Sequence, residues 1–365
     1  MKRVLFYAIY PAPYRAEILA KLNSDYQTDV FFEQGGGDDR NNEWFIKGKY
    51  NLLDTVNGKN VFKLCRKNLN QYDLAVIFDF SSLSAIKLIA KCRAKKVPYI
   101  LNCDGAMLFK HGNFIRNAIK RFLVKGAAAY FASGTHARDY FLKYGAKEEN
   151  INFHNFTALR KKDILGKPVS ADEKIKIRKR LGLPTDAKIC IAVGRYIPLK
   201  RYDILIRLWK EMPENTLLLL IGGGPEKANY ERIINENNIS NVILEGFHPF
   251  DELLGYYKAA DIFVHPTSYD VWGLVINEAM ACGLPIVVSD TCVAGRELVE
   301  SGKNGYVVKL GDDAEFMNRI KELLSDDDLR SQMAVKSLEV IKPFYIENMI
   351  DSQIKTIDKT IEGKK

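Results

Sequence analysis

Residues 269–288 read YDVWGLVINEAMACGLPIVV, and this stretch decides how the second half of the chain folds. We predict a helix over 274–281 and a strand over 286–288. Gly283 ends the helix, and the proline that soon follows prevents its continuation. Residues 261–264 ahead of the stretch are apolar after the initial aspartate and favour another strand. Together these segments form a strand, loop, helix and strand of an α/β sheet.

The loop and the start of this helix carry the groups of a ligand site. In an open α/β sheet, ligands bind where loops leave the carboxyl ends of strands. The backbone N–H groups of Gly273 and Leu274 would point at an anion there. Asp270 lies beside them, and Glu278, about one turn inside the helix, can face the same side. The stretch therefore predicts a site for a phosphorylated, hydroxyl-rich ligand.

Composition indicates an ordinary soluble protein of about two domains. The chain has 365 residues, of which 47% are hydrophobic and 27% are charged, so it can bury two cores. Its six cysteines form no C-x-x-C pair, which favours a reduced, cytoplasmic setting. The formal net charge of +9 favours an acidic partner, such as a nucleoside diphosphate, anionic lipid or nucleic acid, without choosing between them.

The first ten residues resemble a signal peptide only in part. A basic start precedes apolar residues 4–10, but this apolar part is short, is interrupted by polar groups and lacks a small-residue cleavage site. We predict a first strand over 3–8 instead. No segment approaches the length of a membrane span.

An alternation of strands and helices predicts two parallel sheets. The first half of the chain favours strands over 3–8, 30–33, 74–78, 99–103 and 128–132, and helices over 14–22, 83–95 and 115–125. The second half favours strands over 189–193, 216–221 and 242–245, and helices over 202–211 and 227–237. The expected fold class is α/β, with two Rossmann-like doubly wound domains facing a cleft.

Composition also predicts the domain boundaries. Residues 161–176 are polar, charged and interrupted by glycine and proline, which is typical of a linker. The N-terminal domain then covers 1–160 and the C-terminal domain 177–342. A closing helix occupies the last part of the chain, 343–365.

Two cations follow the strand that ends at Gly194. The guanidinium of Arg195 can donate two hydrogen bonds to a phosphate in bidentate geometry, and Lys200 can add a point charge. They could stabilise a departing nucleoside diphosphate without a metal ion, because they neutralise the charge on the leaving oxygen. A lone basic cluster is more often a solvated patch, but the strand–Gly–Arg context favours the phosphate site. We expect His265 and Cys282 to be packed residues rather than a base and a nucleophile.

Two further strand ends carry weaker signals. The glycines 222–224 fit a plain loop and a nucleotide-binding loop about equally, and they lack the spacing of a dinucleotide fingerprint. Asp104 either contacts a sugar or an acceptor, or forms a turn before the glycine that follows it. Tyr14 and Arg15 are weaker candidates for the same contact.

Taken in order, these motifs resemble the C-terminal domain of glycosyltransferase family four, which comprises retaining enzymes of the GT-B fold. The matching residues are 194–195, Lys200, 222–225, 244–247, 260–261, 266–268, 270, 278–285, 295–297 and 304–305. The order and spacing are hard to obtain by chance. The resemblance covers the second half of the chain closely and the first half only in its α/β layout.

The resemblance implies roles for individual residues. In the family, an Arg and a Lys bind the donor diphosphate, the first acid of an E-x7-E pair contacts the transferred sugar, and the last acid holds the ribose. These roles fall on Arg195, Lys200, Asp270 and Glu278. The implied donor site also includes Gly194, Gly223, Phe247, Gly273 and Leu274. The family's usual mechanism needs no cofactor, metal ion or protein nucleophile, and its closing helix crosses back to the first domain.

Two positions depart from the family pattern. Asp270 is shorter by a methylene than the usual Glu, so its contact with the sugar hydroxyls must shift. The first loop, residues 11–15, lacks the paired glycines that many relatives place beside the donor phosphates. Part of the phosphate cradle therefore differs.

The helix expected over 114–125 has apolar residues at helical spacing, interleaved with Arg116, Lys120, Arg121 and Lys125. Such a face either rests on anionic lipid or packs its apolar stripe on a core, and the two readings are about equally expected. In the first case, the acceptor would be a lipid-linked saccharide and the enzyme peripheral on the cytosolic face of a membrane.

The sequence thus predicts a retaining glycosyltransferase that moves a hexose-type sugar from a nucleoside diphosphate sugar to a saccharide or lipid-linked saccharide, in polysaccharide or glycolipid biosynthesis. A non-catalytic nucleotide-sugar-binding protein would keep Arg195, Lys200 and Glu278 without turnover. A nucleic-acid-binding protein would explain the net charge of +9, but the basic residues are not interleaved with exposed aromatic residues in one module. We therefore expect no nucleic-acid partner.

Overall fold

A computed structural model describes residues 1–33, 68–106 and 113–363, so the glycine-rich segment near residue 36 lies outside the described part. The chain divides into two compact units. Unit 1 comprises Met1–Ala158 and Tyr345–Lys365, and unit 2 comprises Leu159–Phe344. The expected cleft between two domains stays a prediction.

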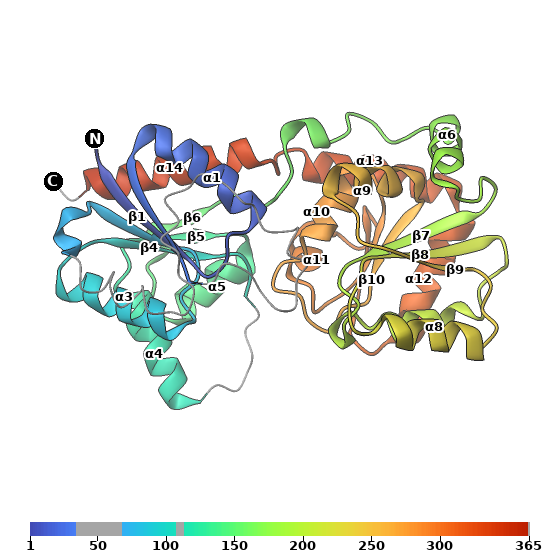
Figure 1. The fold of residues 1–365 in the computed structure, drawn as a ribbon, viewed down its shortest axis with the longest axis horizontal. Coiled ribbons are helices and arrows are strands. Elements are labelled where there is room, and N and C mark those ends of the chain that lie inside the picture. The colour runs from blue at the N-terminus through green and yellow to red at the C-terminus, as the bar shows by residue number, and fades with distance from the viewer. Residues whose placement is uncertain (34–67, 107–112, 364–365) are drawn as a thin grey trace. The chain divides into compact units, whose positions relative to one another are not determined.

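Unit 1 is built on a parallel sheet whose described strands have the order β2-β1-β3-β4-β5-β6. These strands are β1 (Arg3–Ala8), β2 (Gln27–Phe32), β3 (Leu74–Ile77), β4 (Tyr99–Cys103), β5 (Ala129–Ala132) and β6 (Ile151–Phe153). The helices are α1 (Pro13–Asp25), α3 (Leu83–Ala94), α4 (Phe114–Lys125), α5 (Thr135–Lys143) and α14 (Ile346–Glu362). Helices α1 and α14 cover one face of this sheet, and α3, α4 and α5 cover the other (Figure 1).

Unit 2 has a second parallel sheet, with the order β12-β11-β10-β7-β8-β9. Its strands are β7 (Lys188–Val193), β8 (Thr216–Ile221), β9 (Val242–Glu245), β10 (Ile262–His265), β11 (Ile286–Ser289) and β12 (Gly305–Val308). Its helices are α6 (Ala171–Leu181), α7 (Tyr202–Trp209), α8 (Lys227–Glu236), α9 (Phe250–Ala259), α10 (Leu274–Ala281), α11 (Val293–Leu298), α12 (Asp313–Ser325) and α13 (Asp327–Ile341). Side chains from α7, α8 and α12 fill one face of the sheet, while α9 and α10 contact strands from the other side (Figure 1).

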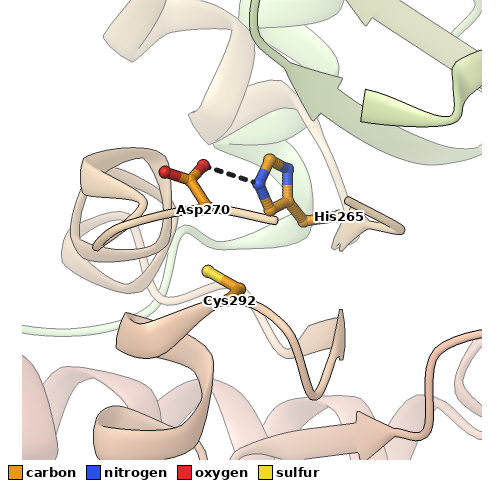
Figure 2. Close-up of side chains that lie close together, drawn as sticks. All are labelled: His265, Asp270 and Cys292. Carbon is orange, nitrogen blue, oxygen red and sulfur yellow. Dashed lines mark hydrogen bonds and ion pairs between the residues drawn. The ribbon is translucent and has the colours of Figure 1, made fainter. Parts of the chain in front are cut away.

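Each sheet has a point where the chain turns from one direction across the sheet to the other. In unit 1 this switch point lies between β1 and β3, and in unit 2 it lies between β7 and β10. Loops that leave the carboxyl ends of such neighbouring strands diverge to opposite faces and leave a crevice where ligands bind. His265 ends β10 and Asp270 follows it in the next loop, at the switch point of unit 2 (Figure 2).

The predicted elements agree closely where the pattern is strong, since β1, β4, β8, β9 and α10 have the expected bounds. The prediction of a linker over 161–176 is wrong in part, because this stretch lies in unit 2 and includes the start of α6. The Ser170 hydroxyl caps that helix by accepting the backbone N–H of Glu173, and the Glu173 carboxylate accepts the backbone N–H of Ser170. This S-x-x-E capping box is a helix-start signal that the nearby glycine and proline obscured.

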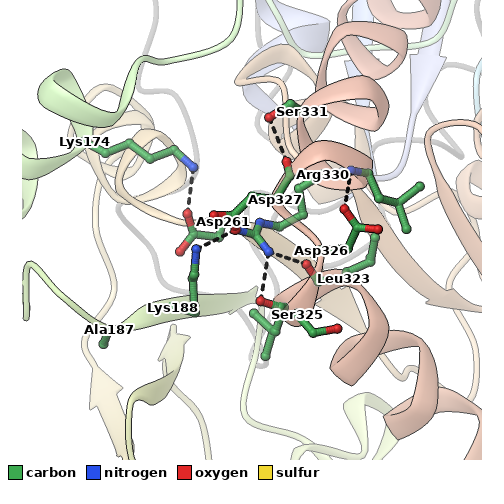
Figure 3. A network of polar contacts seen from close by, with 12 residues as sticks. Lys174, Ala187, Lys188, Asp261, Leu323, Ser325, Asp326, Asp327, Arg330 and Ser331 are labelled. Carbon is green, nitrogen blue, oxygen red and sulfur yellow. Dashed lines mark hydrogen bonds and ion pairs between the residues drawn. The ribbon is translucent and has the colours of Figure 1, made fainter.

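A buried ionic cluster fixes α6 to the sheet of unit 2. The carboxylate of Asp261 accepts hydrogen bonds from Lys174 at 2.9 Å (Figure 3) and from Arg178 at 2.8 Å. It also accepts the backbone N–H of Ile189 in β7 at 2.8 Å. The Arg178 guanidinium donates in addition to the carbonyl of Ala259 at 2.8 Å. The cluster therefore joins α6, α9, β7 and the start of β10.

We expect Asp261→Ala to lower the free energy of unfolding by ~3–5 kcal/mol, because Arg178 would remain buried without its counter-ion. Urea unfolding followed by the fluorescence of Trp209 and Trp272, which are both in unit 2, would measure the change. Glu339→Ala is the matched control, since it removes only the exposed pair with Lys336. Equal shifts of the two urea midpoints would contradict the role of the cluster.

Candidate functional site

The loop after β7 brings a lysine back over the end of its own strand. Gly194 has a φ of +155°, and a Cβ atom there would lie 2.9 Å from the hydroxyl of Tyr202 and 3.6 Å from Cε of Lys200. A glycine is therefore needed where these two side chains pass. A short 3-10 helix, Pro198–Lys200, then carries Lys200 to the switch point.

The loop after β10 is hydrogen-bonded to the loop after β7 at Leu199, the residue before Lys200. The carbonyl of Leu199 accepts hydrogen bonds from the Thr267 hydroxyl at 3.0 Å and from the Ser268 backbone N–H at 2.8 Å. The Ser268 hydroxyl donates to the same carbonyl at 3.0 Å. These contacts fix the two loops to each other, and none of them was predicted from the sequence.

Lys200 and Asp270 form an ion pair at this junction. The Lys200 Nζ lies 2.6 Å from Asp270 Oδ2. His265 Nε2 lies 3.2 Å from the same oxygen (Figure 2). Burial alone would raise the pKa of Asp270, but the His265 hydrogen bond and the Lys200 charge hold it well below its usual range. Burial and the Lys200 charge lower the pKa of His265. The imidazole is therefore neutral and donates its Nε2–H to the carboxylate.

His265, Asp270 and Cys292 together offer ligand atoms within 4.8 Å of one another, a spacing that suits a metal ion (Figure 2). Their chemistry does not fit one. Burial raises the pKa of the Cys292 thiol to about 12, and this thiol donates to the carbonyl of Trp272 at 3.1 Å. A metal needs the thiolate, and it would also have to compete with the Lys200 ammonium for Asp270.

Helix α10 begins at Leu274, as predicted, and its start lies beside this ion pair. Gly273 precedes the helix with a φ of +97°, and a Cβ atom there would lie 2.7 Å from Sγ of Cys292 and 3.5 Å from Oδ2 of Asp270. Leu274 is the first residue of the helix, so the N–H groups of this turn lie next to Asp270 and Lys200. Residues that the sequence singled out in the loop after β7 and in the loop after β10 therefore lie together at one site.

Glu278 lies on α10, partly buried, with a partner that the sequence did not suggest. The hydroxyl of Tyr257, from α9, donates to its Oε2 at 2.8 Å. Burial raises the pKa of Glu278 to about 7, although the hydrogen bond from Tyr257 opposes the shift.

The glycine-rich loop after β8 lies against the loop that carries Arg195. The backbone N–H of Tyr196 donates to the carbonyl of Gly223 at 2.8 Å, and a Cβ atom at Gly222 would lie 1.9 Å from the carbonyl oxygen of Gly194. Only glycine allows this approach. Arg195 is partly buried in this loop, and Phe247, after β9, has 44% of its surface exposed.

Unit 1 has its own charged cluster at its switch point. The guanidinium of Arg15, only 6% exposed, contacts Asp79 at 2.6 Å and Asp104 at 3.3 Å. Arg15 is therefore held by two carboxylates, while Tyr14 packs edge-on against Phe156. Asp79 was not predicted, although it follows β3 as Asp104 follows β4. Burial and the nearby Asp79 raise the pKa of Asp104, while Arg15 opposes the shift.

The family of the C-terminal part follows from its sequence. The profile of the family described as glycosyl transferases group 1 matches residues 173–339, which include both loops of the junction. This segment, just under half of the chain, is similar to that family. The expected resemblance to glycosyltransferase family four is confirmed.

Curated glycosyltransferases match over part of their length. The D-inositol 3-phosphate glycosyltransferase of Thermobispora bispora is 36% identical over 169 residues, which are 42% of this chain and 39% of that protein. The lipopolysaccharide core biosynthesis glycosyltransferase LpsE of Rhizobium meliloti is 28% identical over 215 residues, 58% of this chain and 59% of LpsE. The chain thus spans less than two thirds of each of these relatives.

Solved glycosyltransferase structures match the whole fold. Sucrose-phosphate synthase from Thermosynechococcus elongatus has a TM-score of 0.76 at 18% identity and covers 100% of both chains. Anabaena HepE, solved in complex with UDP, has a TM-score of 0.73 at 18% identity and covers 98% of this chain and 100% of its own. The predicted fold class, with two α/β domains of the GT-B type, is confirmed.

Glu278→Gln tests the burial of the carboxyl through the pH dependence of stability. The pKa of Glu278 is raised from 4.5 to about 7, so its protonated form stabilises the fold below about pH 4.5, and this contribution is lost as the pH rises through 7. Glutamine cannot ionise. We expect the variant to melt near the wild-type temperature at pH 5 and above it at pH 8. An equal difference in melting temperature at both pH values would contradict the raised pKa.

Proposed function

We propose that this protein is a retaining glycosyltransferase that transfers a hexose-type sugar from a nucleoside diphosphate sugar to a saccharide or lipid-linked saccharide, in polysaccharide or glycolipid biosynthesis. The observation that carries the proposal is the Lys200–Asp270 junction beside the start of α10, inside a glycosyl transferases group 1 domain. HepE, which has the same fold, was solved with UDP and glucose. LpsE is named for lipopolysaccharide core biosynthesis.

The junction supplies what a departing nucleoside diphosphate requires. The bond between the sugar carbon and the β-phosphate oxygen breaks, and negative charge grows on that oxygen. Lys200, Arg195 and the N–H groups of Gly273 and Leu274 neutralise this charge in a site of low polarity. The acceptor hydroxyl attacks the same face of the sugar, and a phosphate oxygen takes its proton. The reaction then needs no metal ion, because lysine and arginine provide the positive charge.

Glu278 is proposed to bind the ribose of the donor. A carboxylate accepts hydrogen bonds from two vicinal hydroxyl groups, and the Tyr257 hydroxyl fixes one of its oxygens at 2.8 Å. Because the pKa of Glu278 is about 7 in the free protein, donor hydroxyls would favour its ionised form and lower this pKa.

The acceptor is proposed to bind at the carboxyl edge of the sheet in unit 1. The side chains of Asp79 and Asp104 are 27% and 19% exposed, and both are oriented by the buried guanidinium of Arg15. Carboxylates held in this way accept hydrogen bonds from saccharide hydroxyls. In this proposal Arg15 positions the carboxylates and does not itself contact the acceptor.

Lys200→Ala and Arg195→Ala should each lower the transfer rate by on the order of a hundredfold or more, because the charge on the leaving oxygen loses its partner. The release of nucleoside diphosphate from UDP-, GDP- and ADP-sugars, with and without acceptor oligosaccharides, measures the rate. EDTA should leave the wild-type rate unchanged. Wild-type binding of a nucleotide sugar without turnover on any acceptor would favour the non-catalytic alternative.

Helix α4 exposes an apolar stripe instead of packing it on the core. Only Leu123 and Val124 are buried in this helix, whereas Phe114 is 86% exposed, Ile115 66% and Phe122 44%. The core-packing alternative thus accounts for little of the stripe. The basic residues of the helix flank it, and no helix of the described residues is long and apolar enough to cross a membrane. We propose that α4 rests on an anionic membrane surface, where a lipid-linked acceptor would be found.

Replacing Phe114 and Ile115 by Ser should release the protein from anionic vesicles, because most of the inserted apolar surface is lost. Co-sedimentation with vesicles of phosphatidylglycerol and phosphatidylcholine measures binding. Leu83→Ser is the control, since Leu83 is 76% exposed in the same unit but lies on α3. Equal sedimentation of all three proteins with the vesicles would exclude α4 as the contact.

A further inference from the structure

The oxygen of Asp270 that meets Lys200 is already shared between two donors. Lys200 Nζ lies 2.6 Å from Oδ2 and His265 Nε2 lies 3.2 Å from it. Of these side chains, His265 is fully buried, Lys200 is 12% exposed and Asp270 is 21% exposed. The carboxylate of Asp270 therefore lies between a histidine from the sheet interior and a lysine from the loop after β7.

This arrangement restrains a side chain that is otherwise flexible. Lysine has four rotatable bonds along its stem, and holding it in one geometry costs conformational entropy. Here the Lys200 stem passes close to Gly194. The preceding residue, Leu199, is held through its carbonyl by the Thr267 hydroxyl, and the Lys200 ammonium is bound to Asp270. The charge that would meet the donor diphosphate is in position before any donor arrives.

The Asp270 side chain is not needed to hold its own loop. The Asp270 backbone N–H donates to the carbonyl of Thr291 at 3.1 Å, and its carbonyl accepts the N–H of Val293 at 3.3 Å. The backbone of the loop is therefore fixed independently of the carboxylate. If the Asp270 carboxylate only stabilised its own loop, its contact with Lys200 would have no explanation.

We propose that Asp270 and His265 are positioning residues for Lys200, and that Asp270 competes with the donor diphosphate for its ammonium. This inference rests on the proposed function, and it differs from the sugar contact that the family resemblance implies for this position. The shorter side chain of Asp, compared with the usual Glu, keeps the carboxylate on His265 and Lys200. After transfer, the Lys200 ammonium leaves the nucleoside diphosphate and pairs with Asp270 again, which favours release of this product.

Removing the Asp270 charge should strengthen the binding of free nucleotide rather than weaken it. In Asp270→Asn the competing charge is gone, so UDP, GDP or ADP without any sugar should bind more tightly, by on the order of tenfold for the nucleotide that fits. The rate of transfer should fall at the same time, because the ammonium is no longer held. A residue that only contacts the transferred sugar would leave the affinity for the sugar-free nucleotide unchanged.

Isothermal titration with UDP, GDP and ADP, alongside kcat and KM for transfer, tests this. Asp270→Ser is a second charge-neutral variant, and circular dichroism checks that each variant is folded. His265→Phe keeps the aromatic packing against Phe263 but removes the N–H donor and leaves the Asp270 charge in place, so it should change nucleotide affinity by a smaller factor than Asp270→Asn. Asp290→Asn is the matched control, because Asp290 follows β11 and bonds to the N–H of Leu310.

The outcomes separate the two proposals. Tighter nucleotide binding with slower transfer in the Asp270 variants, and no change in Asp290→Asn, would support the inference. Unchanged or weaker nucleotide binding in folded Asp270 variants would overturn it while leaving the glycosyltransferase function intact. If wild-type protein bound none of the three nucleotides and none of their sugars, the proposed function itself would fail.

Discussion

One ion pair joins the two loops on which the site of unit 2 depends. Lys200 comes from the loop after β7 and Asp270 from the loop after β10, the two neighbouring strands at the switch point of the sheet. The parallel sheet brings these loops to one edge, although 70 residues separate the two side chains in sequence. The glycines at 194 and 273 then allow the close approach, because any Cβ atom at either position would meet side chains of the junction. The chemistry of the site is thus a direct result of strand order.

The same logic applies in unit 1, with the opposite balance of charge. There a single buried arginine contacts two carboxylates at the switch point between β1 and β3, whereas in unit 2 Lys200 contacts one aspartate and Arg195 lies in the same loop as Lys200. An edge rich in carboxylates suits hydroxyl groups, and an edge rich in cations suits phosphates. In the proposed function, two sheets of similar topology therefore receive different chemical groups.

The sequence was sufficient for the elements whose pattern is local. Apolar runs that end in glycine or proline gave the strands and α10, and the strand-end residues Lys200, Asp270 and Gly273 meet as expected. The sequence could not provide partners that depend on distant packing. Tyr257 reaches Glu278 from α9, and His265 reaches Asp270 from the interior, so both look like ordinary core residues in a linear pattern.

Asp79 was within reach of prediction, because it follows its strand as Asp104 does. The start of α6 was also within reach, through its capping box.

Helix α14 has a consequence for the way the chain is made. Its buried residues Met349, Ile350 and Ile357 belong to unit 1, and its Gln353 bonds to His154 at 3.1 Å, yet it is encoded after the whole of unit 2. During synthesis from the amino terminus, one face of the unit 1 sheet is covered by α1 but lacks α14 while the 186 residues of unit 2 leave the ribosome. Unit 2 is continuous in sequence, so it can fold before unit 1 is complete. Loss of the last helix would therefore damage the half of the protein that was translated earliest.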